Sequence, residues 1–276
     1  MSWDERQRAM LAEMGLRVWS ALPSPEALPA APALPILPIL PVAAVQALPA
    51  ALRPKPQPAT ELDSVSSKVE GGERLPAIAR MDWAELRASA AECRSCRLCS
   101  GRGNSVFGAG SSTAHWLVVG EAPSEQEDLE GEPFAGQASR LLGNMLRAID
   151  VSSSPAPELA VPPERQAYLC TALKCRPPPG SAPGGDELQQ CRPYLERQIV
   201  LLKPRIILAL GRLAVQTLLG SNEALGRLRG RVHDFQGIPV IVSFPPSYLL
   251  RNLADKARAW EDLCLARATL QSLGPP

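Results

Sequence analysis

The sequence lacks an excess of charge of either sign. Its 276 residues include 29 Lys and Arg and 28 Asp and Glu, for a formal net charge of +1. Nucleic acids bind proteins largely through Lys and Arg contacts to phosphate, so a strongly basic domain would indicate such a partner. The composition excludes a DNA-binding role that depends on overall basicity. Such a role would need a local basic face.

The chain also lacks a long uninterrupted apolar run. The N-terminus carries Asp4 and Glu5 and has no continuous apolar stretch of the kind that a secretory signal needs. The apolar segment 33–48 is interrupted by three prolines and is too short to span a bilayer. Seven cysteines without a signal peptide favour a reducing compartment and metal ligation over disulfides. We therefore expect a cytoplasmic protein with no membrane partner.

Aromatic residues are absent between residues 21 and 69. This stretch is rich in alanine and in Leu-Pro pairs, which resist helix and sheet because proline fixes φ and lacks an N–H donor. Before it, residues 3–20 carry apolar side chains at helical spacing, typical of an amphipathic helix that packs on the domain or docks into a partner. We predict a partner-binding peptide at 1–20, a disordered Ala/Pro-rich linker at 21–74 and a folded domain at 75–276.

The last part of the chain alternates strand-like apolar runs with helical stretches. A first helix is predicted over Met81–Ala91, with Asp82 as its N-cap. Four strands are predicted at 116–119, 167–173, 205–210 and 240–244, and further helices at 139–149, 187–202, 212–219 and 255–270. This alternation indicates a three-layer α/β/α domain around a four-stranded parallel sheet.

Three sequence blocks fall at one edge of the predicted sheet. Gly120–Ser124 follows the first strand, Lys174–Pro178 closes the second, and Phe244–Arg251 follows the fourth. The carboxyl ends of parallel strands meet at one edge, and ligands bind there in such sheets. We therefore expect the three blocks to form one site.

Four cysteines accompany these blocks. Cys93 and Cys96 form a Cys-x-x-Cys pair, and fifteen residues separate Cys175 from Cys191. By ligand count, four thiolates from two segments suit a tetrahedral zinc ion or a [4Fe-4S] cluster equally well. The second close pair of a zinc ribbon is missing, and unrelated core cysteines are a further alternative. Cys99 is a possible alternative ligand.

Together the blocks and cysteines resemble the iron–sulfur uracil-DNA glycosylases of family 4, over about residues 90–265. The resemblance implies a [4Fe-4S] cluster on Cys93, Cys96, Cys175 and Cys191, DNA as the partner, and a pocket for a base flipped out of the duplex. It places Gly120 where the backbone approaches the base and Phe134 where uracil stacks. Glu121 matches the glutamate that positions the attacking water. An active member would hydrolyse the N-glycosidic bond of uracil in DNA.

Two residues depart from the family pattern. Thr171 stands in place of the asparagine that reads uracil, and a hydroxyl cannot reproduce the paired donor and acceptor of an amide. Pro245 stands in place of the histidine that stabilises charge on the departing base. Losing one such donor typically costs on the order of 10²–10³ in rate. We therefore expect glycosylase activity to be weak or lost. His233, expected in a surface loop, is a poor replacement.

Several residues are expected to face the DNA duplex. An apolar leucine beside an arginine suits base extrusion and clamping of the backbone, although ordinary packing at a helix start explains Leu249 equally well. The expected DNA contacts are Arg176, Arg229, Arg231, Ser247, Leu249 and Arg251.

Residues 3–19 are similar to the N-terminal peptide of the psi subunit of bacterial DNA polymerase III, mainly through the pattern Leu-x-x-Met-Gly-Leu-x-x-Trp at 11–19. That peptide anchors psi to the clamp loader. The similarity implies an alternative function, in which the chain is a non-catalytic replisome component tethered to the clamp loader by residues 1–20.

Overall fold

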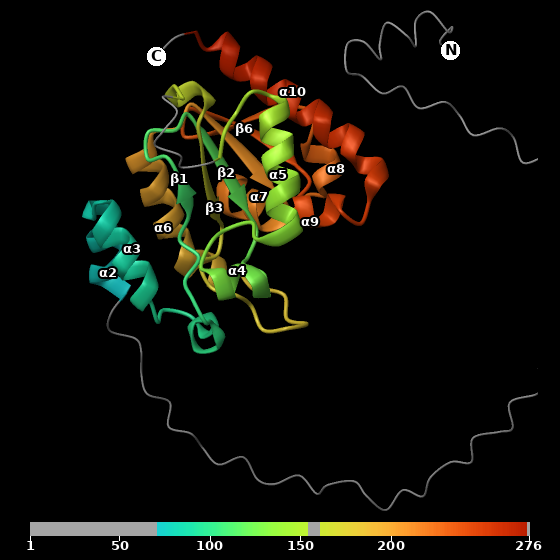
Figure 1. The fold of residues 1–276 in the computed structure, drawn as a ribbon. Coiled ribbons are helices and arrows are strands. Elements are labelled where there is room, and N and C mark those ends of the chain that lie inside the picture. The colour runs from blue at the N-terminus through green and yellow to red at the C-terminus, as the bar shows by residue number, and fades with distance from the viewer. Residues whose placement is uncertain (1–70, 154–160, 275–276) are drawn as a thin grey trace, which may run out of the picture. The chain divides into compact units, whose positions relative to one another are not determined.

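The computed structural model describes residues 71–153 and 161–274 (Figure 1). The peptide expected at 1–20 and nearly all of the linker expected at 21–74 lie outside this part of the chain. Helix α2 spans Gly71–Arg80, and its Arg74 side chain donates a hydrogen bond to Gln190 at 3.0 Å. Contacts with the rest of the domain are therefore already made at Arg74, the last residue of the expected linker.

A six-stranded sheet in the order β1-β3-β2-β4-β6-β5 lies at the centre of the described residues. The strands are β1 (Ala109–Gly110), β2 (Trp116–Gly120), β3 (Ala167–Thr171), β4 (Ile206–Leu210), β5 (Val232–Phe235) and β6 (Ile238–Ser243). The four middle strands pair in parallel, and β1 and β5 pair antiparallel at the two edges. The parallel sheet expected from the sequence is confirmed.

The expected count of four strands was too low. β1 has only two residues, and three of the four residues of β5 are exposed or half-buried. Neither edge strand carries a buried apolar run, so periodicity gives no signal for them. His233, expected in a surface loop, pairs with Val240 of β6 instead.

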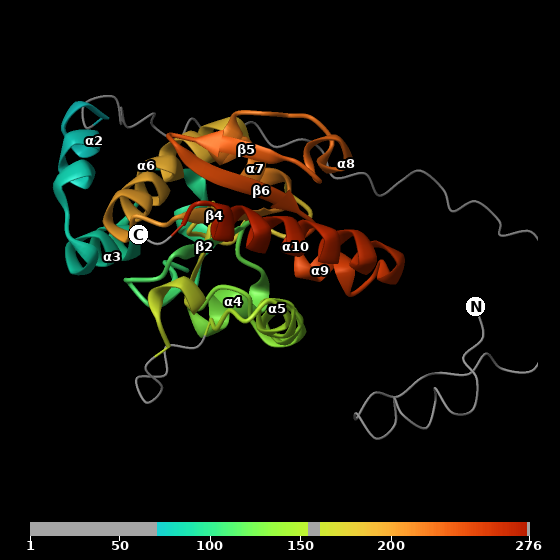
Figure 2. The ribbon, with the colours of Figure 1, turned by 90° about the horizontal axis from the view of Figure 1, so that it is seen from above.

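Helices cover both faces of the sheet (Figures 1 and 2). They are α3 (Trp83–Glu92), α4 (Glu125–Glu130), α5 (Gly136–Ala148), α6 (Gly185–Leu202), α7 (Arg212–Leu219), α8 (Leu225–Leu228), α9 (Pro246–Leu249) and α10 (Lys256–Ser272). Helix α2 lies beside α3, and both pack against α6. Short 3-10 helices span Arg97–Gly101, Pro163–Arg165 and Leu253–Asp255. None of the helices in the described ranges is long and apolar enough to cross a membrane.

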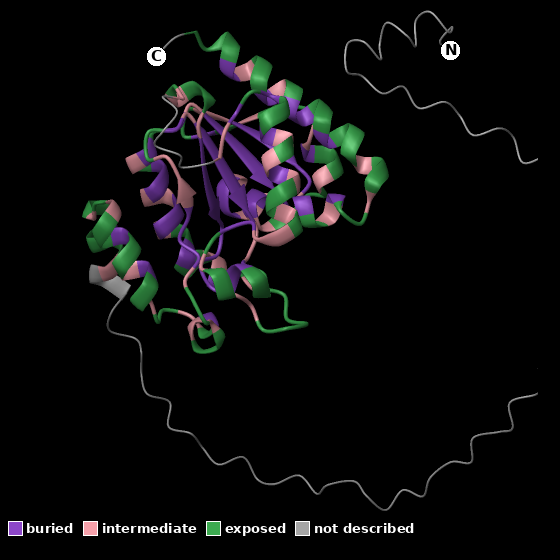
Figure 3. Cartoon of the chain, viewed as in Figure 1, coloured by how far each residue is buried: buried purple, intermediate pink, exposed green. Residues whose placement is uncertain are grey.

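The two core layers follow from alternation along the strands. Leu117 and Val119 of β2 face α6 and α7, whereas Trp116 and Val118 face α5 and α10. All five residues of β2 are buried, as are those of β3 and β4 (Figure 3). A parallel sheet covered on both faces needs such continuous apolar strands, and the polar groups of the site are left to the strand ends.

Candidate base-binding site and cysteine cluster

The three sequence blocks meet at the carboxyl edge of the sheet. The N–H of Ala172, just after β3, donates to the carbonyl of Gly120 at 2.9 Å, and Leu173 donates to the carbonyl of Glu121 at 3.3 Å. On the other side, the N–H of Gly211 donates to Ser243, the last residue of β6, at 3.1 Å. The first two bonds join the first block to the end of β3, and the third joins the end of β4 to the end of β6, just before the third block.

A cavity of about 600 Å³ opens between the first and third blocks. Its lining includes Glu121, Arg212, Phe244, Pro245, Tyr248 and Arg251. The strand order therefore brings two of the three blocks to one cavity, which two carboxylates (Glu121 and Glu223), two arginines and two aromatic rings line. The expected base-binding residues Gly120, Phe134 and Thr171 do not belong to this lining.

Glu121 caps a helix. Its Oε1 atom accepts hydrogen bonds from the N–H groups of Arg212 at 2.8 Å and Leu213 at 3.3 Å, which begin α7. A Cβ atom on Gly211, whose φ is +101°, would lie 2.4 Å from the Glu121 side chain. The carboxylate thus satisfies free N–H groups and lies at the positive end of the helix dipole. Sequence reasoning missed this role, for which Gly211 before a helix is the only local signal.

The ring of Phe134 packs against Gly120 of the first block. Its ring approaches Gly120 so closely that a Cβ there would lie 2.7 Å from the ring edge. Phe134 has φ +57°, a left-handed conformation uncommon for a bulky residue. The buried carboxylate of Glu127 accepts hydrogen bonds from the N–H groups of Phe134 and Ser124 and holds this conformation. With 6 % of its surface exposed, Phe134 packs under the first block.

Neither substituted position presents a donor to the cavity. Thr171 is 1 % exposed, and its hydroxyl donates to the carbonyl of Val106 at 3.3 Å. Pro245 lies in the cavity wall as the residue before α9. Its side chain carries only carbon, and its carbonyl accepts from the N–H of Tyr248 at 3.0 Å.

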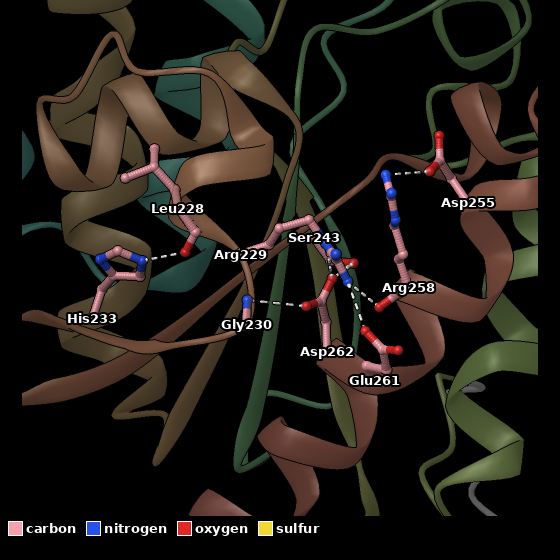
Figure 4. A network of polar contacts seen from close by, with 9 residues as sticks. All are labelled: Leu228, Arg229, Gly230, His233, Ser243, Asp255, Arg258, Glu261 and Asp262. Atoms are coloured by element: carbon pink, nitrogen blue, oxygen red, sulfur yellow. Dashed lines mark hydrogen bonds and ion pairs between the residues drawn. The ribbon is translucent and has the colours of Figure 1, made fainter.

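A buried aspartate of α10 holds the third block in place (Figure 4). Asp262, 0 % exposed, accepts hydrogen bonds from Arg229 at 2.9 Å, from the N–H of Gly230 at 3.2 Å and from Ser243 at 2.7 Å. Burial raises the pKa of Asp262, although these donors oppose that effect. Arg229 in turn lies over the ring of Phe244, 5.1 Å from its centre.

An aromatic stack continues this network into the cavity. Phe244 and Tyr248 stack with ring centres 5.2 Å apart at 21°, and the Tyr248 hydroxyl donates to Asp255 at 2.7 Å. The guanidinium below the stack belongs to Arg229, whose side chain is 11 % exposed and ion-paired with Asp262. This placement differs from the expected DNA contact, because the charge of Arg229 is neutralised inside the domain.

The other expected DNA contacts divide into two groups. Arg231, Ser247 and Arg251 are exposed. Arg176 is partly buried and pairs with Glu125 at 3.4 Å. Leu249 is 1 % exposed and packs against Phe244 and Ala259, which favours the packing alternative for this leucine. Leu250 beside it is 36 % exposed.

The four expected cysteine ligands line one small cavity, together with Cys99. Burial raises the pKa of Cys191 to about 12, so this thiol stays protonated unless a bound cation stabilises its thiolate. The neighbouring Lys174 amine is buried and donates to the carbonyl of Thr171 at 2.7 Å and to Gln198 at 2.8 Å. Burial lowers the pKa of Lys174. The four expected ligands and Cys99 thus share one small cavity beside a buried amine.

Residues 107–264, more than half of the chain, match the model of the uracil DNA glycosylase superfamily. The chain belongs to this superfamily. The Type-4 uracil-DNA glycosylase of Thermotoga maritima is 34 % identical over 187 residues, which cover 66 % of this chain and 92 % of the relative. That of Saccharolobus solfataricus is 33 % identical over 189 residues, 66 % of this chain and 83 % of the relative.

These findings confirm the resemblance drawn from the three sequence blocks. The uracil DNA glycosylase match includes Cys175 and Cys191 but begins after Cys93 and Cys96. The superfamily domain therefore contains all three blocks of the site, while half of the expected cysteine ligands lie before the matched residues.

Proposed function

We propose that this chain is a uracil-DNA-glycosylase-like DNA-repair or replication protein that binds DNA and has weak or no glycosylase activity. The observation that carries the proposal is the loss of donors at the base pocket. Pro245 offers none, and the hydroxyl of Thr171 is bonded to Val106. A site that lacks its hydrogen bonds to a base loses discrimination steeply, and a departing anionic base goes unstabilised.

DNA binding is supported by what remains at the rim. Arg251 and Arg212 are exposed and border the cavity, and Arg231 is exposed just before the edge strand β5. Arginine contacts to phosphate position a protein on DNA without reading its sequence. Such contacts do not depend on the groups that the pocket has lost.

The presence of five cysteines around one small cavity supports a [4Fe-4S] cluster at this place. Among the described residues, no three His, Cys, Asp or Glu side chains are arranged so that they could hold one metal ion. A four-iron cluster takes one thiolate per iron and accepts ligands spread around it, which favours it over zinc. When bound, the cluster would cross-link the segment before β1 to the segment after β3. Cys93, Cys96, Cys175 and Cys191 would hold it.

Positive groups around the cysteines suit a cluster with a net negative charge. The Arg102 guanidinium donates to the Cys175 sulfur at 3.1 Å, and Arg74 lies 3.7 Å from the Cys93 sulfur. Donors to ligand sulfur tune a cluster and orient its ligands.

A uracil-release assay with matched variants tests the catalytic part. The full-length chain is incubated with single- and double-stranded DNA containing uracil, next to the variants Thr171→Asn/Pro245→His and Pro178→His. We expect the double variant to release uracil on the order of 10²–10³ times faster than the wild type. Pro178→His, on an exposed loop, controls for an added imidazole.

Wild-type turnover as fast as that of the double variant would contradict the proposed loss of activity. DNA binding is measured separately by fluorescence anisotropy with Arg251→Ala. The proposal requires that this variant bind more weakly and with a smaller salt dependence.

A further inference from the structure

Five cysteines, rather than four, line the cavity proposed to hold the cluster. They are Cys93, Cys96, Cys99, Cys175 and Cys191. A [4Fe-4S] cluster bound by cysteine takes four thiolates, so one of the five is in excess.

Cys96 and Cys99 lie on a single turn. Cys96 is the extended residue before the 3-10 helix Arg97–Gly101, and the N–H of Cys99 donates to the Cys96 carbonyl at 3.3 Å. Both side chains border the same cavity, although they come from different backbone conformations.

The other three sulfurs are fixed by donors from other segments. These bonds are Arg74 to Cys93 at 3.7 Å, Arg102 to Cys175 at 3.1 Å, and the Lys174 N–H to Cys191 at 3.3 Å. The Cys96 sulfur accepts a hydrogen bond from the N–H of Leu98 in its own turn. In the ranges that the structure describes, no donor from another segment bonds to the sulfur of Cys96 or Cys99. Hydrogen bonds from other segments thus hold three of the ligand sulfurs in place. Two thiols of one turn, Cys96 and Cys99, are available as the fourth ligand.

We propose that Cys96 and Cys99 are interchangeable fourth ligands of the cluster, an inference that depends on the cluster proposed above. In the exchange, the S–Fe bond of Cys96 breaks and that sulfur takes up a proton. The Cys99 thiol releases a proton and forms the new S–Fe bond. No electron is transferred, and the charge of the site is unchanged.

Iron and sulfide content, with the visible and electron paramagnetic resonance spectra of the reduced protein, test the inference on the full-length chain purified without oxygen. Cys96→Ser and Cys99→Ser should each keep the iron of the wild type, with a shifted resonance spectrum in Cys96→Ser. The double variant Cys96→Ser/Cys99→Ser and the single variant Cys175→Ser should lose it.

Loss of iron from Cys96→Ser, to the level of Cys175→Ser, would overturn the interchange. A wild type without iron would instead overturn the proposed cluster, so the two failures are distinct. Circular dichroism of each variant identifies those that have lost their fold.

Alkylation of the wild type gives a second measurement that needs no variant. The native holoprotein is treated briefly with iodoacetamide and its peptides are mapped by mass spectrometry. Label shared between Cys96 and Cys99, never both in one molecule while the cluster persists, supports the exchange. Label confined to Cys99 overturns it. Cys264, an exposed free cysteine, serves as the internal standard for reactivity.

Discussion

The contact between Phe134 and Gly120 shows how one absent side chain shapes the pocket. The ring lies where a Cβ atom at residue 120 would be, and Phe134 keeps a left-handed backbone to place it there. The glycine therefore leaves room for the ring beneath the first block. The sequence indicated both residues, but not that they touch each other, because their contact depends on the turn held by Glu127.

Replacing Gly120 tests this contact. Gly120→Ala should lower the free energy of unfolding by about 1–3 kcal/mol, because the added methyl group overpacks a buried ring. Urea unfolding followed by far-UV circular dichroism measures the change.

Gly143→Ala is the matched control, since residue 143 lies within α5 and, apart from its chain neighbours and the backbone of its own helix, no atom lies within 4 Å of the added Cβ. This variant should be more stable than the wild type by about 0.5–1 kcal/mol, because alanine favours helix. Equal effects of the two substitutions would contradict the proposed packing.

Among the elements, α10 does more than cover the sheet. Its Asp262 joins β6 to the loop before β5, and through Arg229 it supports the aromatic stack at the cavity. Apolar periodicity predicted this helix and the parallel strands, because burial on one face leaves a pattern in the sequence. It could not predict that Arg229 pairs inside the domain, since its partner lies 33 residues away.

The buried pair gives a prediction for α10. Asp262→Asn should lower the free energy of unfolding by about 1–3 kcal/mol. The amide NH2 group replaces a carboxylate oxygen that accepts hydrogen bonds from Arg229, Gly230 or Ser243, so buried donors lose their acceptor. The neighbouring Glu261 is exposed and 3.8 Å from Arg229, so Glu261→Gln should change stability by less than about 1 kcal/mol. Chemical denaturation of both variants at neutral pH distinguishes a buried from a surface ion pair.

The same aspartate should make the free energy of unfolding depend on pH. Burial raises the pKa of Asp262 in the folded protein, so the folded state binds a proton in a range where the unfolded state has released it. Stability contributed by this group is therefore highest below its ordinary pKa of about 3.9 and falls as pH rises through the raised value.

The side chain of Asp262→Asn cannot titrate. The difference in unfolding free energy between wild type and variant therefore changes with pH only through Asp262. As pH is lowered from neutral, the wild type should gain stability relative to the variant, as measured by denaturation at several pH values. A constant difference, or one that shrinks towards acid pH, would show that the aspartate is not destabilised by burial.

On the scale of the whole molecule, the proposed cluster joins segments that the sheet does not connect. Cys93 and Cys96 lie between α3 and β1, whereas Cys175 precedes the loop that leads into α6 and Cys191 lies within α6. The cysteine spacing indicated a shared site, and the structure adds the donors that surround it. The donor Arg74 could not be read from the sequence, because it lies on α2, outside the segments that carry the cysteines.

Removal of iron should therefore loosen the domain. Treatment with a chelator under oxidising conditions should lower the melting temperature, because a ligand bound only by the folded state stabilises it. Differential scanning calorimetry of the holo and stripped protein measures this effect. Identical melting temperatures would exclude a structural role for the metal.

The N-terminal peptide, residues 1–20, lies outside the described residues. If residues 1–20 bind the clamp loader, Trp19→Ala should reduce recovery of clamp-loader proteins in a pull-down, because large aromatic side chains dominate binding energy at interfaces. Trp260→Ala removes a half-exposed tryptophan of the folded domain and serves as the control. Equal recovery with both variants would exclude this role of the peptide.

The helix-capping bond of Glu121 gives a structural reason for an acidic residue at this position, in addition to the catalytic one. A protein that no longer cleaves its substrate can still need this side chain, because losing a cap costs about 1 kcal/mol of stability. An acidic residue at this position therefore does not by itself diagnose a working glycosylase. For sequences of this kind, the residues at 171 and 245, which form no such scaffold bond to α7, are the more informative guide to chemistry.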